Sequence, residues 1–201
     1  MTRRPIAVTS VPPMDDLHLA IEAAKAGGDI VARYFGAPPD AEYKGKFDPV
    51  TAVDRASEEA ILGLIRTHRP DDEILAEESG GTAHPGRHWI VDPLDGTVNF
   101  VHSIPHVSVS IALYDGDDAV VAVVYDPLKD ELFSAASGEG ARLNGHVITV
   151  SDQHDLEKSV IATGFPYNHD EIADELAVVV REMLRNANGI RRMGSAALDL
   201  A

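Results

Sequence analysis

The chain has 201 residues, which is enough for one well-cored domain but too few for two typical ones. Its 44% hydrophobic and 25% charged residues are ordinary for a globular protein and exclude collagen-like, low-complexity and disordered chains. Its 33 acidic and 17 basic residues give a net charge of −16, which predicts no direct contact with nucleic acid.

The start of the chain shows no periodic pattern. We expect residues 1–13 to form a flexible N-terminal tail, because they carry two arginines but no apolar stretch of signal-peptide length. No apolar run in the sequence approaches the roughly 18 residues of a membrane span. We therefore expect no membrane association and a cytoplasmic protein.

Two amphipathic helices are predicted next. From Asp15, apolar residues recur at helical spacing, and the pattern ends at Gly36 just before two prolines. Thr51 or Asp54 can cap a second helix, whose apolar face ends before Pro70.

The centre of the chain predicts a single sheet of short strands. Apolar runs separated by Gly, Asn and Asp turns occur at 73–77, 88–92, 107–113, 119–125, 131–135 and 147–150. A last long helix is expected over 169–186, and helical spacing resumes at Ser195. Because this spacing breaks off at Ala201, we expect residues 14–201 to form a single domain that is incomplete at its C-terminus.

Candidate metal-binding and catalytic residues are most concentrated in residues 89–100, WIVDPLDGTVNF. Here an apolar strand is followed by two carboxylates, a glycine and a hydroxyl. Asp92 and Asp95 flank a proline turn, so both can converge on one cation with the Leu94 carbonyl between them. The chain has no cysteine, which leaves oxygen or imidazole as ligands and favours a hard cation.

Two neighbouring features extend this pattern. A short helix that starts near Gly96 and Thr97 would offer free N–H groups to a phosphate. Glu77 and Glu78 end the preceding strand and would add a carboxylate at the same sheet edge.

A simpler interpretation is open at each of these positions. Asp92 before proline and Asp95 before glycine can act only as turn formers. Glu77 and Glu78 can be a solvated strand exit.

The string Asp95-Gly-Thr also matches the second half of the aspartate-nucleophile phosphatase motif. The nucleophile position of that motif is Pro93 here, so water activated by metal is the remaining nucleophile. Phosphate monoesters need up to about 10²¹-fold acceleration. A general base supplies about 10²- to 10⁴-fold. A cluster of divalent ions held by several carboxylates could supply the rest.

Four segments together resemble the inositol monophosphatase family: 77–79, 89–102, 138–145 and 191–197. The likeness runs from about Asp15 to the last residue. It implies an α+β fold, a layered αβαβα sandwich of the inositol monophosphatase and fructose-1,6-bisphosphatase type, which would be incomplete here at the C-terminus. A later Trp-Asp motif of the family, whose aspartate binds metal, would lie beyond Ala201.

The resemblance also implies roles for individual residues. Two or three Mg²⁺ ions would be bound by Glu77, Asp92, the Leu94 carbonyl and Asp95. Asp54 would hydrogen-bond the Thr97 hydroxyl, and Glu77 and Thr97 would orient the attacking water. Substrate would be bound by Asp95, Gly96, Thr97, Gly194, Ser195 and Ala196. Lys44 and Lys46 would belong to a mobile basic loop, although loop lysines are often only solvated charges.

The expected function is therefore that of a magnesium-dependent phosphomonoesterase acting on inositol 1-phosphate or a similar small polyol phosphate. Lithium sensitivity and a homodimer follow from the resemblance alone. Fructose 1,6-bisphosphate, histidinol phosphate and adenosine 3′,5′-bisphosphate are alternative substrates within the same chemistry. A non-catalytic protein-binding role and a truncated pseudoenzyme are the alternatives from other classes.

Overall fold

The structure is a computed structural model that describes residues 14–81 and 85–201. The expected N-terminal tail, residues 1–13, lies outside the described residues. The helices are α1 (Asp16–Tyr34), α2 (Ala52–His68), α3 (Thr97–Val101), α4 (Ala173–Asn186) and α5 (Ala196–Leu200), with one 3₁₀ turn, η1 (Leu156–Lys158). Within the described residues, none of the helices is long and apolar enough to cross a membrane.

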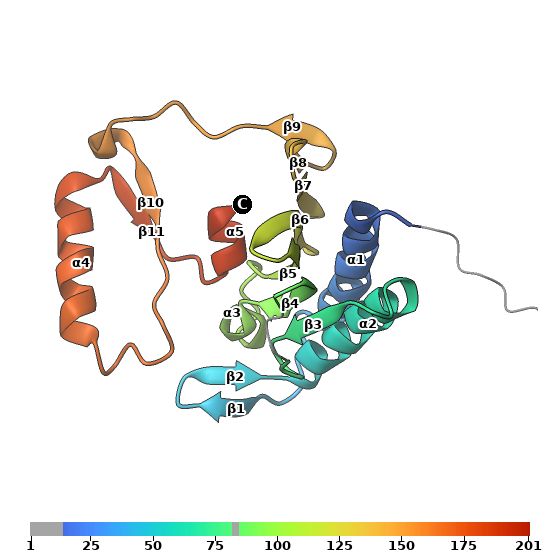
Figure 1. Ribbon diagram of the computed structural model, residues 1–201. Coiled ribbons are helices and arrows are strands. Elements are labelled where there is room, and N and C mark those ends of the chain that lie inside the picture. Colours follow the sequence, from blue (N-terminus) through green and yellow to red (C-terminus); the bar gives the residue numbers. More distant parts are fainter. Residues whose placement is uncertain (1–13, 82–84) are drawn as a thin grey trace, which may run out of the picture.

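A seven-stranded sheet forms the centre of the molecule (Figure 1). Its order follows the chain: β3 (Glu73–Ala76), β4 (Arg87–Asp95), β5 (Ser108–Asp115), β6 (Asp118–Asp126), β7 (Glu131–Ala136), β8 (Gly140–Leu143) and β9 (His146–Ile148). Within this sheet, as far as the structure describes it, β3 and β4 pair in parallel and every other neighbouring pair is antiparallel. The α+β class expected from the sequence is confirmed.

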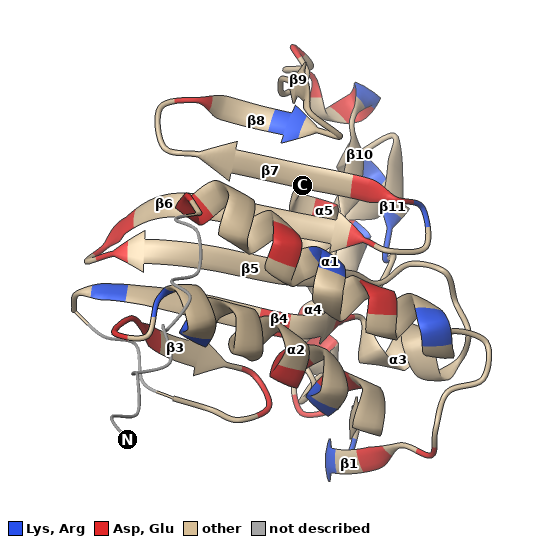
Figure 2. Ribbon diagram, turned by 90° about the vertical axis from the view of Figure 1, so that its right-hand side faces the viewer, with Lys and Arg blue, Asp and Glu red and all other residues tan. Residues whose placement is uncertain are grey.

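Helices α1 and α2 lie side by side across one face of this sheet (Figure 2). Alternate residues of β5 and β6 point into that layer and are buried, among them Ile111, Leu113 and Val123. The two helices cross closely, because a Cβ added at Gly27 of α1 would lie 2.6 Å from the Ser57 hydroxyl of α2. This layer is the main hydrophobic core.

The start of α2 shows which of the two predicted capping residues acts. Thr51 is the N-cap, and its side chain accepts a hydrogen bond from the N–H of Val53. Asp54 completes a capping box by accepting from the backbone N–H of Thr51 at 2.8 Å. The helix ends at His68, before Pro70, as predicted.

Two small units lie outside the central sheet. The strands β1 (Glu42–Gly45) and β2 (Asp48–Val50) form a hairpin between α1 and α2. The strands β10 (Val160–Ala162) and β11 (Gly189–Arg191) pair in parallel beside α4, away from the sheet (Figure 1). Helix α5 then returns to β5 and β6.

The last long helix begins later than predicted. Periodicity places its start at 169, but α4 begins at Ala173, so the prediction is wrong by four residues. The His169 ring lies 4.5 Å from the Phe47 ring, and Asp170 pairs with Lys46 at 2.6 Å. These contacts with the β1–β2 hairpin occupy residues that would otherwise form the first helical turn.

Candidate active site

The site lies where three chain segments meet at one edge of the sheet: the exit of β3, the end of β4 with the start of α3, and the start of α2. Because β3 and β4 are parallel, their C-terminal ends lie together, and Ala76 pairs with Val91. The next residues are Glu77 and Asp92, so the register alone places these two acidic residues side by side. The N–H of Glu77 continues the ladder to the Val91 carbonyl at 3.1 Å.

The Glu77–Asp92 pair carries more negative charge than its surroundings neutralise. Burial, the charges of Glu77 and Asp95 and a hydrogen bond with Glu77 raise the pKa of Asp92 to about 9. The N–H of Leu94, 3.1 Å from Asp92 Oδ1, opposes this rise but does not cancel it. A proton or a cation must therefore balance the pair at neutral pH.

The Thr97 hydroxyl is held by a buried carboxylate from α2. Thr97 Oγ1 lies 3.0 Å from Asp54 Oδ1 and 3.1 Å from the Leu94 carbonyl oxygen. Asp54 is buried, and its other oxygen accepts from the N–H and the hydroxyl of Thr51. The Asp54–Thr97 hydrogen bond implied by the family resemblance is therefore present, and Leu94 O faces this hydroxyl.

The turn between β4 and α3 requires a glycine. Gly96 has φ of +98°, and a Cβ added there would lie 3.1 Å from the carbonyl oxygens of His106 and Gly194. This close approach brings the chain at Gly194 against the start of α3.

Asp95 joins that distant segment to the site. Its Oδ2 accepts from the Ser195 hydroxyl at 2.5 Å and from the N–H of Ala197 at 2.8 Å, and its Oδ1 accepts from the N–H of Ala196 at 3.2 Å. Asn99 Nδ2 donates to the Met193 carbonyl at 2.8 Å. Gly194, Ser195 and Ala196, predicted on the substrate side, thus lie beside the start of α3.

The same contacts separate Asp95 from the other two acids. Across residues 14–81 and 85–201, no three acidic or histidine side chains converge in metal-ligand geometry. Glu77 and Asp92 are neighbours, whereas the Asp95 carboxylate is directed at the N-terminus of α5. Like charges repel when no cation bridges them, and amide N–H groups attract a carboxylate.

The donor chemistry fits a hard divalent cation. All the candidate ligands are oxygen atoms: the carboxylates of Glu77, Asp92 and Asp95 and the Leu94 carbonyl. Burial and the neighbouring charges of Glu77 and Asp95 raise the pKa of Asp92, so a proton or a cation is favoured beside this pair. Bringing Asp95 into such a site requires that its carboxylate turn away from α5.

Two further residues, Glu58 and Lys44, support the site, and the sequence patterns did not identify Glu58. Glu58, almost fully buried on α2, accepts from the N–H groups of Glu78 at 2.8 Å and Ser79 at 2.9 Å, which fixes the exit of β3. Its signal was available, because Glu58 follows Asp54 by one helical turn on the buried face. Lys44, one of the two loop lysines, places Nζ 2.6 Å from Glu78 Oε1 and 3.5 Å from Glu77 Oε1.

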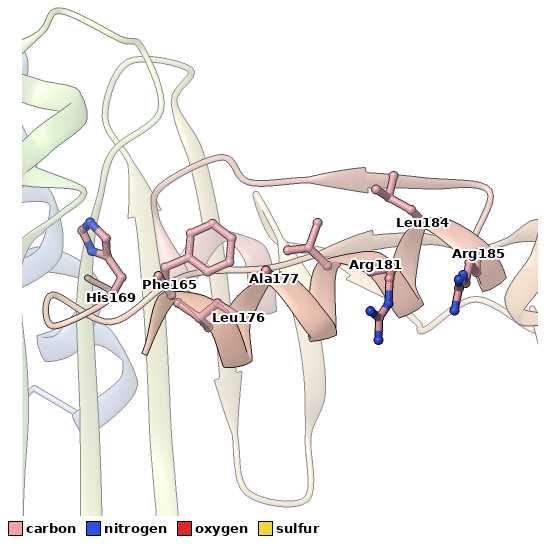
Figure 3. Close-up of a pocket in the computed structure, with 9 residues that line it drawn as sticks. Phe165, His169, Leu176, Ala177, Arg181, Leu184 and Arg185 are labelled. Atoms are coloured by element: carbon pink, nitrogen blue, oxygen red, sulfur yellow. The ribbon is translucent and has the colours of Figure 1, made fainter. Parts of the chain in front are cut away.

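A cavity of about 420 Å³ opens beside Thr97. It is lined by Asp95, Gly96, Thr97, the 162–167 segment, Arg192, residues 194–196 and Asp199. A larger apolar groove of about 550 Å³ follows α4 (Figure 3), but no carboxylate lines it. The smaller cavity therefore has the polar groups that a phosphorylated ligand needs.

Comparison with known proteins gives one consistent result. The model of the inositol monophosphatase family matches residues 14–201. "Nus factor SuhB" of Escherichia coli is 42% identical over 190 residues, which cover 92% of this chain and 71% of that protein. "Inositol monophosphatase 1" of Solanum lycopersicum is 40% identical over 192 residues, which cover 92% and 70%.

Solved structures agree with the sequence relatives. The extragenic suppressor protein suhB of Bartonella henselae superposes with a TM-score of 0.85 at 39% identity, covering 90% of this chain and 71% of that chain. An IMPase of Thermotoga maritima gives a TM-score of 0.84 at 35% identity, covering 92% and 71%.

Proposed function

The chain belongs to the inositol monophosphatase family, and from that premise we propose that it is a magnesium-dependent phosphomonoesterase acting on inositol 1-phosphate or a similar small polyol phosphate. The observation that carries this proposal is one juxtaposition. The Glu77–Asp92 pair, in which the pKa of Asp92 is raised, lies at the same sheet edge as Thr97, whose hydroxyl is held by Asp54 and which lines a cavity.

Glu77, Asp92, Asp95 and the Leu94 carbonyl would hold two or three Mg²⁺ ions. When bound, Mg²⁺ lowers the pKa of water and neutralises phosphoryl oxygens, which a phosphate monoester needs. The residue that must move for this is Asp95, since its oxygens now accept from Ser195 and the amides of α5.

Thr97 and Glu77 would orient the attacking water. A hydroxyl has one proton, and when Thr97 donates it to Asp54 the oxygen of Thr97 can only accept from a further partner. A water that donates to both Thr97 and Glu77 would keep a lone pair free to attack a phosphorus atom. Asp54 thus acts as a positioning residue.

The phosphate and the alcohol would occupy the two sides of the cavity beside Thr97. The N–H groups of Gly96 and Thr97 would bind phosphoryl oxygens. Gly194, Ser195, Ala196 and Asp95 would line the side that receives the polyol, where hydroxyl groups can find polar partners.

Phosphate release by the purified protein tests the proposal. The panel is inositol 1-phosphate, fructose 1,6-bisphosphate, histidinol phosphate and adenosine 3′,5′-bisphosphate, each with Mg²⁺ and with a chelator. Turnover of inositol 1-phosphate that the chelator abolishes is the expected result, and selective turnover of another substrate would correct the substrate assignment. No turnover of any of the four would overturn the enzymatic proposal.

A protein-binding role is the second candidate, because relatives at 42% identity carry the name "Nus factor SuhB". Binding of a protein partner should survive loss of the carboxylate of Asp92, whereas catalysis should not. Capture with wild type and with Asp92→Asn in parallel separates the two roles. The homodimer and the lithium sensitivity implied by the resemblance are further proposals, which light scattering and inhibition by LiCl test directly.

A further inference from the structure

The cavity beside Thr97 is mixed in charge. A phosphate monoester would bring about two negative charges and several acceptor oxygens into it. Of the residues that line the cavity, Asp95 and Asp199 are acidic and Arg192 is basic. The Arg192 guanidinium lies over the Phe165 ring, 5.9 Å from its centroid. Neutral hydrogen-bond donors in the lining would therefore strengthen the binding of a phosphate.

Tyr167 offers such a donor. It lines this cavity together with Gly96 and Thr97. It also lines a neighbouring cavity of about 320 Å³, which Lys46 and Phe47 of the β1–β2 hairpin border, so Tyr167 lies between the two. The residue is 52% exposed, and within the described residues its hydroxyl makes no hydrogen bond. The hydroxyl is therefore free to bind a ligand.

The backbone on both sides of Tyr167 is held by hydrogen bonds. The N–H of Thr163 donates to the Arg191 carbonyl at 2.9 Å, which continues the β10–β11 pairing beyond the strand ends. The N–H of His169 donates to the Pro166 carbonyl at 3.1 Å and closes a turn around Tyr167. Because this segment is already ordered, binding through Tyr167 would cost little backbone entropy.

The surroundings of Tyr167 keep its hydroxyl protonated. Burial raises the pKa of Tyr167 to about 12. The charges of Asp48, Glu77 and Asp92 add to this rise. At neutral pH the phenol therefore offers a proton rather than a negative charge. The same charges place the hydroxyl within electrostatic range of the acidic pair, where the reacting phosphate would lie.

We propose that the Tyr167 hydroxyl is a further substrate-binding group of the cavity beside Thr97 and that it donates a hydrogen bond to a phosphoryl oxygen of the ester. It would act together with the N–H groups of Gly96 and Thr97. This inference rests on the proposed function, because it takes this cavity as the phosphate-binding site.

Three variants test the inference. Tyr167→Phe removes the hydroxyl and keeps the ring, whereas Tyr167→Leu removes both. Tyr34→Phe is the matched control, because Tyr34 ends α1 and lines neither cavity.

The measurements separate binding from turnover. With Mg²⁺ present, Tyr167→Phe should raise the KM of the preferred substrate and the Kd of inorganic phosphate each by about tenfold, since a hydrogen bond to a charged group is lost. Its kcat should stay close to wild type, because the bond already forms in the bound substrate. Calorimetry with inorganic phosphate gives the Kd without turnover. Tyr34→Phe should match wild type in all three constants.

The outcomes distinguish this inference from the proposed function. If Tyr167→Phe matches wild type in KM and Kd, the hydroxyl does not bind the phosphate, and the proposed function stands. If only Tyr167→Leu binds phosphate more weakly, the ring acts by packing and the inference is likewise wrong. If KM rises while the Kd of inorganic phosphate does not, the hydroxyl binds the alcohol part and its assignment to the phosphoryl group is wrong. If wild type neither hydrolyses any ester of the panel nor binds inorganic phosphate, both the inference and the proposed function fail.

Discussion

The hydroxyl of Ser195 lies 2.5 Å from Oδ2 of Asp95, one hundred residues earlier in the chain. Ser195 is fully buried and is the N-cap of α5, so one contact fixes both the start of that helix and the direction of the Asp95 carboxylate. The wall of the cavity beside Thr97 depends on this contact.

Replacing Ser195 by alanine should lower the free energy of unfolding by about 1–2 kcal/mol, because a helix cap and a buried hydrogen bond are lost. The KM of the preferred substrate should rise, since the cavity wall loosens. Urea denaturation and steady-state kinetics measure the two effects. The exposed Ser151→Ala is the matched control, and equal stability of the two variants would contradict the prediction.

The proposed metal site depends on the carboxylate of Asp92. We expect Asp92→Asn to lower kcat more than about a hundredfold while circular dichroism shows a retained fold. Asp117→Asn, in the exposed β5–β6 turn, should keep wild-type activity. Full activity of Asp92→Asn would contradict the assignment of Asp92 as a ligand.

The raised pKa of Asp92 also predicts how stability depends on pH in the absence of metal. Its pKa of about 9 in the folded state exceeds the value of 3.8 of an ordinary aspartate, so between these pH values the folded protein holds one more proton than the unfolded chain. This contribution is fully present below pH 3.8 and is lost as pH rises through about 9. In chelator, Asp92→Asn should therefore gain stability relative to wild type between pH 5 and about pH 9. Urea unfolding of both proteins at several pH values measures the difference, and parallel curves would refute it.

The Thr97 hydroxyl can be tested by paired substitutions. Thr97→Val keeps the shape but leaves Asp54 Oδ1 without its donor, and we expect kcat to fall by about a hundredfold or more. Thr97→Ser restores a hydroxyl and should recover most of the activity. A valine variant as active as the serine variant would show that the hydroxyl does not position the nucleophile.

Alanine substitutions at Gly96 and Gly63 test the turn into α3, with Gly63 as the control position. Gly96→Ala should destabilise the protein by about 1–3 kcal/mol, because φ is +98° and a Cβ would press on two carbonyl oxygens. Gly63→Ala, at an open position within α2, should instead stabilise it by about 0.5–1 kcal/mol. Thermal denaturation gives the sign of each effect.

The parts of the fold that sequence could predict are those governed by local patterns. The two first helices follow their apolar periodicity, and the acidic motif marks the end of β4. The start of α4 was missed because Phe47 and Lys46 hold residues 169 and 170 through tertiary contacts. Periodicity carries no information about partners that far along the chain.

The features of the site, like those of the fold, could be predicted from sequence only in part. Asp92 and Glu77 could be placed together in advance, since each ends a predicted strand and both strand ends were expected at the same sheet edge. The direction of the Asp95 carboxylate could not, because it depends on amide groups from a helix one hundred residues later. Nor could Lys44 be distinguished from a solvated loop charge without the path of the hairpin.

The capping box of α2 has a consequence for how this protein loses activity. The carboxylate that closes the first turn of the helix, Asp54, is the same one that holds Thr97. Fraying of that turn, the least stable part of any helix, would release the hydroxyl while the sheet and the core remain intact. A substitution at Asp54 therefore perturbs folding and chemistry together. Thr51→Ala keeps the Asp54 carboxylate and its bond to Thr97 but removes the hydroxyl that caps the turn and donates to the other oxygen of Asp54, so it reports how far inactivation precedes unfolding.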